Sequence, residues 1–160
     1  MSAGQVKWIA QHEKRRGKPC WDIKAAPHVM TRLKRIFTRA DGGHAGQMLL
    51  ADTPENCREL LWFLDRYPME VSDSDRLKQR AEQHLRIEAA ARDIVAQGLV
   101  KEGKVEMAVS PREYQLVAAN LAVTTGRLLL ADDVGLGKTC SAIATLCQAG
   151  RFPALFVTLT

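Results

Sequence analysis

The sequence predicts an α/β protein in two parts, a small α+β region followed by the start of a parallel α/β unit. Amphipathic helical segments alternate with short apolar runs over residues 20–71. A long polar helix follows over residues 72–98. The last fifty residues then run helix, strand, glycine-rich loop, helix and strand, which is the order of a parallel crossover unit.

Composition indicates a soluble globular chain, because 46% of the 160 residues are hydrophobic and 26% are charged. No apolar run approaches the roughly 18 residues that a membrane span needs, and the N-terminus lacks the apolar core of a signal peptide. The four cysteines have no metal-ligand spacing, so they are expected to be buried thiols in a reducing compartment. We therefore expect an intracellular protein, cytoplasmic or nucleoid-associated or nuclear.

Charge is unevenly distributed along the chain. Residues 1–40 contain ten Lys or Arg and two acidic residues, a net +8, whereas residues 41–75 contain two basic and eight acidic residues, a net −6. Such asymmetry favours a nucleic-acid contact, although a solvated face or a charge match within the chain would explain it equally. Residues 1–19 are interpreted as a basic arm, either flexible or an edge strand followed by a turn.

Residues 20–71 are predicted to form a small β-α-β-α-β accessory domain. Strands are expected at 20–25, 47–52 and 69–72, with one helix starting at Pro27 and another after a Thr53 cap and Pro54. The first helix carries a basic stripe that could contact the DNA backbone or could be a solvated face: Arg32, Lys34, Arg35 and Arg39. The large aromatic residues are assigned to the core rather than to base stacking: Trp8, Trp21, Trp62 and Phe63.

The helix at 72–98 begins with Ser72 and Asp75 in capping-box spacing and ends at Gly98. Its apolar stripe is thin and rich in alanine, so it is interpreted as a strut that links two domains. The remaining segment, 99–160, is predicted to start a nucleotide-binding lobe with strands at 104–110, 127–132 and 153–160.

A phosphate-binding loop lies between the strand and the helix of this last segment, in "LLLADDVGLGKTCSAIATL". Gly135 and Gly137 allow backbone N–H groups to turn towards phosphate oxygens. Lys138 adds a full positive charge, and the Thr139 hydroxyl is a ligand for Mg²⁺. The strict Walker A pattern is not met, because Asp132 occupies the place of its first glycine.

The string "LLLADDVGLGKTCSAIA" resembles motif I of the Swi/Snf-like DNA translocases of helicase superfamily two, where "LADDMGLGKT" is typical. "PREYQLVAANL", whose Gln115 lies 17 residues before Asp132, resembles the Q motif of the same family. The resemblance implies a RecA-like lobe that binds ATP and Mg²⁺. It also implies that Gln115 contacts adenine with Tyr114 behind it, and it places the phosphates on Asp133, Gly135, Leu136, Gly137, Lys138 and Thr139.

"PALFVTLT" resembles motif Ia, with Leu159 where the family has proline. The acidic motif II and the arginine finger that hydrolysis requires do not follow residue 139. The resemblance thus implies the N-terminal part of an ATP-dependent helicase or translocase that acts on double-stranded DNA, with no membrane partner. These 160 residues alone are expected to bind nucleotide without hydrolysing it.

Two other functions remain open from the sequence. The chain could be an adaptor that binds nucleic acid or protein through residues 1–100 and retains a vestigial phosphate loop. It could also be a different P-loop enzyme, such as a small kinase. Asp132 and the lack of substrate-binding elements disfavour the kinase, and the intact Gly-x-Gly-Lys-Thr disfavours the adaptor.

Overall fold

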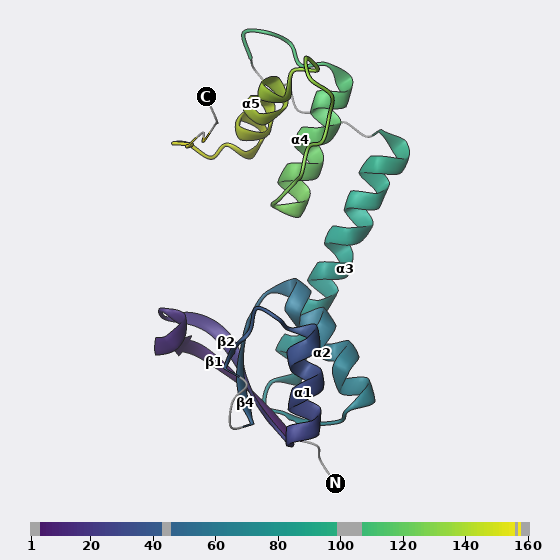
Figure 1. Ribbon diagram of the computed structural model, residues 1–160. Helices are drawn as coiled ribbons and strands as arrows, with labels where there is room; N and C mark the ends of the chain where they lie inside the picture. Colours follow the sequence, from purple (N-terminus) through teal and green to yellow (C-terminus); the bar gives the residue numbers. More distant parts are fainter. Residues whose placement is uncertain (1–3, 43–45, 99–106, 156, 158–160) are drawn as a thin grey trace. The chain divides into compact units, whose positions relative to one another are not determined.

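The computed structural model describes residues 4–42, 46–98, 107–155 and 157, and it shows a mixed α/β chain (Figure 1). The chain divides into two compact units, residues 1–85 and 86–160. No helix in the described part is long and apolar enough to cross a membrane.

Unit 1 is built on a five-stranded sheet in the order β3-β4-β2-β1-β5. All neighbours are antiparallel except β1 and β5, which are parallel. The strands are β1 (Gly4–His12), β2 (Lys18–Ala25), β3 (Asp41–Gly42), β4 (Gln47–Ala51) and β5 (Glu70–Val71).

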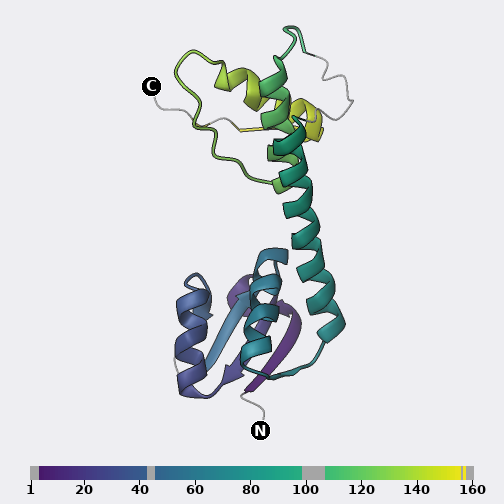
Figure 2. The ribbon, with the colours of Figure 1, turned by 90° about the vertical axis from the view of Figure 1, so that its right-hand side faces the viewer.

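Helices α1 (Pro27–Ile36) and α2 (Pro54–Arg66) lie side by side against one face of this sheet (Figure 2). Each starts with proline at its first position, where the missing N–H costs no hydrogen bond. The predicted Thr53 cap is confirmed, because its hydroxyl accepts from the Asn56 N–H at 3.2 Å. The core of unit 1 consists of apolar side chains from the sheet, both helices and Leu77: Val6, Trp21, Ile23, Val29, Met30, Leu33, Phe37, Met48, Leu50, Cys57, Leu60, Phe63 and Leu77.

Of the two alternatives predicted for residues 1–19, the flexible arm is wrong, and the strand followed by a turn is correct except that the strand is not at the edge of the sheet. Residues 4–12 form β1, an interior strand hydrogen-bonded to β2 on one side and to β5 on the other. Side chains of this strand alternate between the two faces of the sheet. The Val6 side chain is buried beneath the helices, whereas that of Lys7 next to it is exposed. Lys7 is the one lysine or arginine of β1, and most of the positive charge of the segment lies in the turn that follows, at Lys14, Arg15 and Arg16.

Asp52, directly after β4, is a buried carboxylate with only 6% of its surface exposed. It accepts hydrogen bonds from the indole N–H groups of Trp8 and Trp21, both at 3.2 Å, and from the Cys57 thiol at 3.3 Å. Burial, and then the hydrogen bond to the Asp52 carboxylate, raise the pKa of Cys57 to about 12. The thiol therefore stays protonated and acts as a donor.

Two arginines from the long third helix complete the environment of Asp52. Arg76 donates through Nε at 3.0 Å and Nη2 at 2.6 Å, and its guanidinium lies 4.1 Å above the Trp8 ring. Arg80 places its Nε 3.5 Å from Oδ1 and donates through Nη2 to the Asp52 backbone carbonyl. Burial alone would raise the pKa of Asp52, but hydrogen bonds from Arg76, Cys57 and Trp8 outweigh it and lower that pKa.

Helix α3 (Ser74–Gln97) confirms the long helix predicted over 72–98, and the boundary between the units falls within it. The predicted capping box of Ser72 and Asp75 is wrong. Asp73 caps the helix by accepting from the Arg76 N–H at 3.0 Å. Ser72 instead extends the β1–β5 pairing, since its N–H donates to the Val6 carbonyl and its hydroxyl accepts from the Trp8 N–H.

Unit 2 contains α4 (Glu113–Thr125) and α5 (Lys138–Ala149), with Gly126 and Gly150 in left-handed conformation after them. The expected strands at 127–132 and 153–160 are not formed in the described residues, where Leu129 and Leu155 are 92% and 89% exposed. An apolar run becomes a strand only when neighbours satisfy its backbone groups, and the described part of unit 2 contains no strand. For the strand expected at 104–110, residues 107–110 are irregular and the rest lie outside the described residues.

Candidate nucleotide-binding loop

The loop at 132–137 joins the irregular segment after α4 to the start of α5. Two of its residues have the positive φ that favours glycine, Gly135 at 90° and Gly137 at 75°. Gly137 is also the N-cap residue of α5, and no side chain caps this helix. The first N–H groups of a helix have no carbonyl within the helix, so those of Lys138 and Thr139 are not used by α5 itself.

Lys138 folds back over the loop that precedes it. Its ammonium donates to the carbonyl oxygens of Asp132 and Asp133, both at 2.9 Å. These are ordinary hydrogen bonds at an exposed position, and they hold a full positive charge directly over the loop. An incoming phosphate would meet that charge together with the positive end of the α5 dipole.

Tyr114 and Gln115, at the start of α4, contact the loop from its other side. The Tyr114 hydroxyl donates to the Leu136 carbonyl at 2.7 Å. Gln115 Nε2 donates to the carbonyls of Leu136 at 3.1 Å and Gly137 at 3.4 Å, while its Oε1 accepts from the Arg112 N–H at 2.9 Å. The two helices and the loop are thus one hydrogen-bonded assembly within unit 2.

The observed role of Gln115 differs from the one implied by the resemblance. Its side chain is 5% exposed, and its amide is engaged by backbone groups of this chain. In this conformation the amide is not presented to an adenine ring, so the adenine contact stays a prediction. Tyr114 does lie beside Gln115, with its hydroxyl 3.4 Å from Nε2.

Close packing against Gln115 gives Gly137 a second reason to be glycine. A Cβ at residue 137 would lie 2.8 Å from Gln115 Nε2, which is closer than real Cβ atoms approach. At Gly135 a Cβ would meet nothing within 4 Å, so only the backbone angle favours glycine there. The tyrosine–glutamine motif and the glycine-rich loop are therefore in direct contact at Gln115 and Gly137, which the sequence motifs did not reveal.

The loop residues fit a phosphate and its Mg²⁺. The Thr139 hydroxyl is exposed and makes no hydrogen bond with any residue that the structure describes. No cluster of three metal-ligating side chains occurs among the described residues. Thr139 would therefore hold Mg²⁺ together with phosphate oxygens and water, as Mg²⁺ sites at nucleotides commonly do. The Asp133 side chain is exposed, and its observed contribution is its carbonyl.

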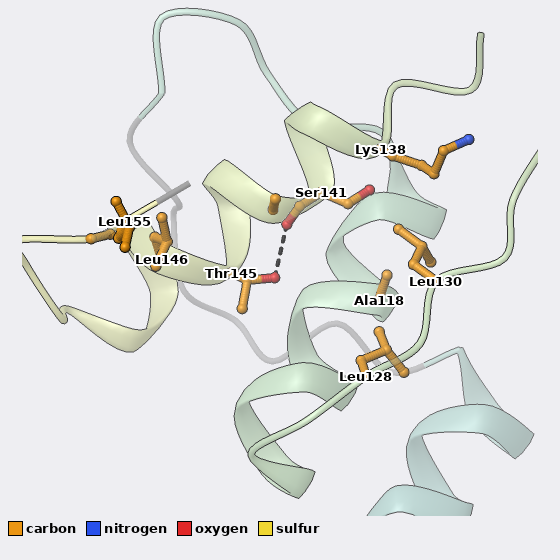
Figure 3. Close-up of a pocket in the computed structure, with 10 residues that line it drawn as sticks. Ala118, Leu128, Leu130, Lys138, Ser141, Thr145, Leu146 and Leu155 are labelled. Atoms are coloured by element: carbon orange, nitrogen blue, oxygen red, sulfur yellow. Dashed lines mark hydrogen bonds between the residues drawn. The ribbon is translucent and has the colours of Figure 1, made fainter. Parts of the chain in front are cut away.

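An apolar cavity of about 350 Å³ lies beside the loop, between α4, α5 and the extended segments around residues 128–130 and 154–155. In Figure 3, Lys138 lies at the start of α5, whereas Leu146 and Leu155 lie near its other end. Ala118 lies close to Leu128 in this view. The lining is mostly apolar, so the loop and not this cavity is the candidate site for a phosphate.

The structure brings the predicted loop residues together with Gln115, but the predicted DNA-contacting arginines belong to the other unit. Arg32 and Arg35 line a groove of unit 1, whereas Lys34 and Arg39 do not. No protein-family model, curated protein or solved structure matches the chain. The assignment of function therefore rests on the motifs and on this geometry.

Proposed function

We propose that unit 2 binds ATP with Mg²⁺ through the loop at 132–139, within an ATP-dependent DNA translocase or helicase of the Swi/Snf-like type. The observation that carries the proposal is the Lys138 ammonium held over the loop by the carbonyls of Asp132 and Asp133 at 2.9 Å. Glycines at positive φ and the uncapped start of α5 supply the donors beside it. The choice of ATP and of DNA rests on the resemblance of the two motifs.

In this proposal the side chains of this chain bind and orient the phosphates and Mg²⁺. Lys138 would exchange its carbonyl partners for the terminal phosphates, a stronger charge-assisted pair. Thr139 would fix Mg²⁺ against the same phosphates. Hydrolysis needs a catalytic acid and an arginine finger that these 160 residues do not contain, so binding without turnover is expected from this chain.

The first test is calorimetric titration of the chain with ATP, with and without Mg²⁺. Lys138→Ala should weaken binding by about tenfold or more, because a charge-assisted hydrogen bond contributes about 1.5–3 kcal/mol. Arg151→Ala is the matched control, since it removes an exposed cation from the same unit and should change little. Thr139→Val should lower affinity only when Mg²⁺ is present.

Absence of ATP binding by the unaltered chain, or equal affinity in Lys138→Ala, would refute the nucleotide site and favour the adaptor. The translocase assignment is tested separately, in protein that carries the catalytic acid and second lobe. There, Lys138→Ala should abolish DNA-stimulated ATP hydrolysis and leave DNA binding intact. Hydrolysis that DNA does not stimulate would favour another class of P-loop enzyme.

A further inference from the structure

A basic and aromatic groove lies between α1 and α2 in unit 1. Its cavity has a volume of about 220 Å³. We call it the α1–α2 groove and define it by its lining: Arg32, Arg35, Ile36, Trp62, Phe63, Arg66 and Tyr67. Three guanidinium groups and three aromatic rings meet there, and no carboxylate is part of the lining.

Trp62 is the feature of this groove that the fold does not explain. It was expected in the core, yet 56% of its surface is exposed, whereas Trp21 is fully buried. Helix α2 turns Leu60 and Phe63 into the core, and Trp62 lies off that face. A large apolar ring left in water contributes little to folding, and exposed aromatic rings commonly mark binding surfaces.

The arginines of the groove are available to a ligand. The side chains of Arg35 and Arg66 form no ion pair or hydrogen bond with any residue that the structure describes. The guanidinium carbon of Arg32 lies 5.8 Å from the centre of the Tyr67 ring, within the range of a cation–π contact. Favourable interaction with the helix dipoles accounts for cations in the last turns of α1 and α2. It does not account for the exposed indole of Trp62, which lines the same groove.

We propose that the α1–α2 groove binds the unpaired nucleotides of a single-stranded nucleic acid, with a base stacked on Trp62 and phosphates held by Arg35 and Arg66. Stacking needs a free base face, which a paired duplex does not offer away from its ends. Arginine matches phosphate with two parallel hydrogen bonds. A ligand that combines flat rings with negative charge satisfies both halves of the lining, whereas an acidic peptide satisfies only the arginines.

This proposal rests on unit 1 alone and does not require nucleotide binding by unit 2. It also differs from a general basic face on α1, because Arg39 is an exposed cation outside the groove. That difference makes Arg39→Ala a matched control for Arg35→Ala.

The test is fluorescence anisotropy of a labelled oligothymidylate, and of an oligouridylate of equal length, with the whole chain. Trp62→Ala should weaken binding about fivefold to 100-fold, and Trp62→Phe should restore much of the affinity. Thermal unfolding should be nearly unchanged in both variants, because the ring is exposed. Arg35→Ala with Arg66→Ala should lower the slope of log affinity against log salt by about 1–2, whereas Arg39→Ala should have a smaller effect.

Equal binding by Trp62→Ala and the unaltered chain would overturn the proposal. So would a perfectly paired duplex that binds as tightly as the single strand, or polyglutamate that displaces the oligonucleotide at the same charge concentration. Binding of either the DNA or the RNA oligonucleotide, lost in Trp62→Ala, supports it and shows which strand is preferred. Binding of neither overturns it, and neither result bears on the ATP site.

Discussion

Replacing Asp52 by asparagine should destabilise unit 1 by about 3 kcal/mol, because it removes a buried charge and keeps the shape. The amide can still accept from one indole, but it no longer pairs with the Arg76 guanidinium, now bound at 3.0 and 2.6 Å. Its NH₂ group would also face N–H donors that need an acceptor. Hydrogen bonds to charged groups contribute about 1.5–3 kcal/mol, and each buried donor left unsatisfied costs about 1–3 kcal/mol.

Partial rehydration limits this loss. The side chains of Arg76 and Arg80 are 34% and 29% exposed, so water can solvate part of each guanidinium once the carboxylate is gone. We therefore expect the loss of unfolding free energy to lie nearer the lower end than the upper end of the sum of these two contributions.

The assay is urea unfolding followed by tryptophan fluorescence, since Trp8 and Trp21 both contact Asp52. The control is Asp41→Asn, which breaks an ion pair to Arg15 where the aspartate side chain is 53% exposed. Surface pairs contribute about 0–1 kcal/mol. If Asp52→Asn shifts the unfolding free energy no more than Asp41→Asn does, at equal slope against urea, the carboxylate is not an organising group of the core.

Two further predictions concern the pH dependence of the Asp52 contribution and the glycines at 126 and 137. The pKa of Asp52 is lowered on folding, so its contribution to stability is complete at pH values above the unfolded pKa of about 4. That contribution is lost as pH falls through the lower pKa of the folded state. The free energy of unfolding should therefore change less with pH below about pH 4 in Asp52→Asn than in the unaltered chain. Gly137→Ala and Gly126→Ala each place alanine at positive φ, about 75°, and should each cost about 1–2 kcal/mol in urea unfolding. Only Gly137→Ala should also weaken ATP binding, because its methyl group displaces Gln115 while a Cβ at 126 meets nothing; equal ATP affinities would show that the contact with Gln115 is dispensable.

Local sequence signals predicted the helices and most strands of unit 1. The Thr53 cap and the prolines at 27 and 54 mark helix starts that depend on a few adjacent residues. A strand within residues 1–19 was one of two predicted alternatives, but its interior position was not predicted, because the pairing of β1 with β5 joins residues about 65 positions apart. Trp62 was assigned to the core because of its large apolar side chain, although its position on α2 lies off the face that carries Leu60 and Phe63.

Long-range features could not be predicted from the sequence. Asp52 collects donors from residues 8, 21, 57 and 76, and no pattern along the chain announces that meeting. The apolar runs at 127–132 and 153–155 have strand composition, but composition cannot supply the neighbouring strands that pairing requires. For the loop, glycine, lysine and threonine were identified correctly as a group, whereas the engagement of Gln115 by the backbone was not foreseen.

The hydrogen bonds around the loop engage most of its backbone carbonyl oxygens. The carbonyl oxygens of Asp132 and Asp133 are taken by Lys138, and those of Leu136 and Gly137 by side chains of α4. With these acceptors engaged, the N–H groups at the start of α5 and the Lys138 ammonium remain to meet an anion, beside the exposed carboxylate of Asp133. A phosphate that takes Lys138 as its partner would release the carbonyls of Asp132 and Asp133, whereas the side chains of α4 would keep those of Leu136 and Gly137. Binding would thus free the first half of the loop and leave its second half in place.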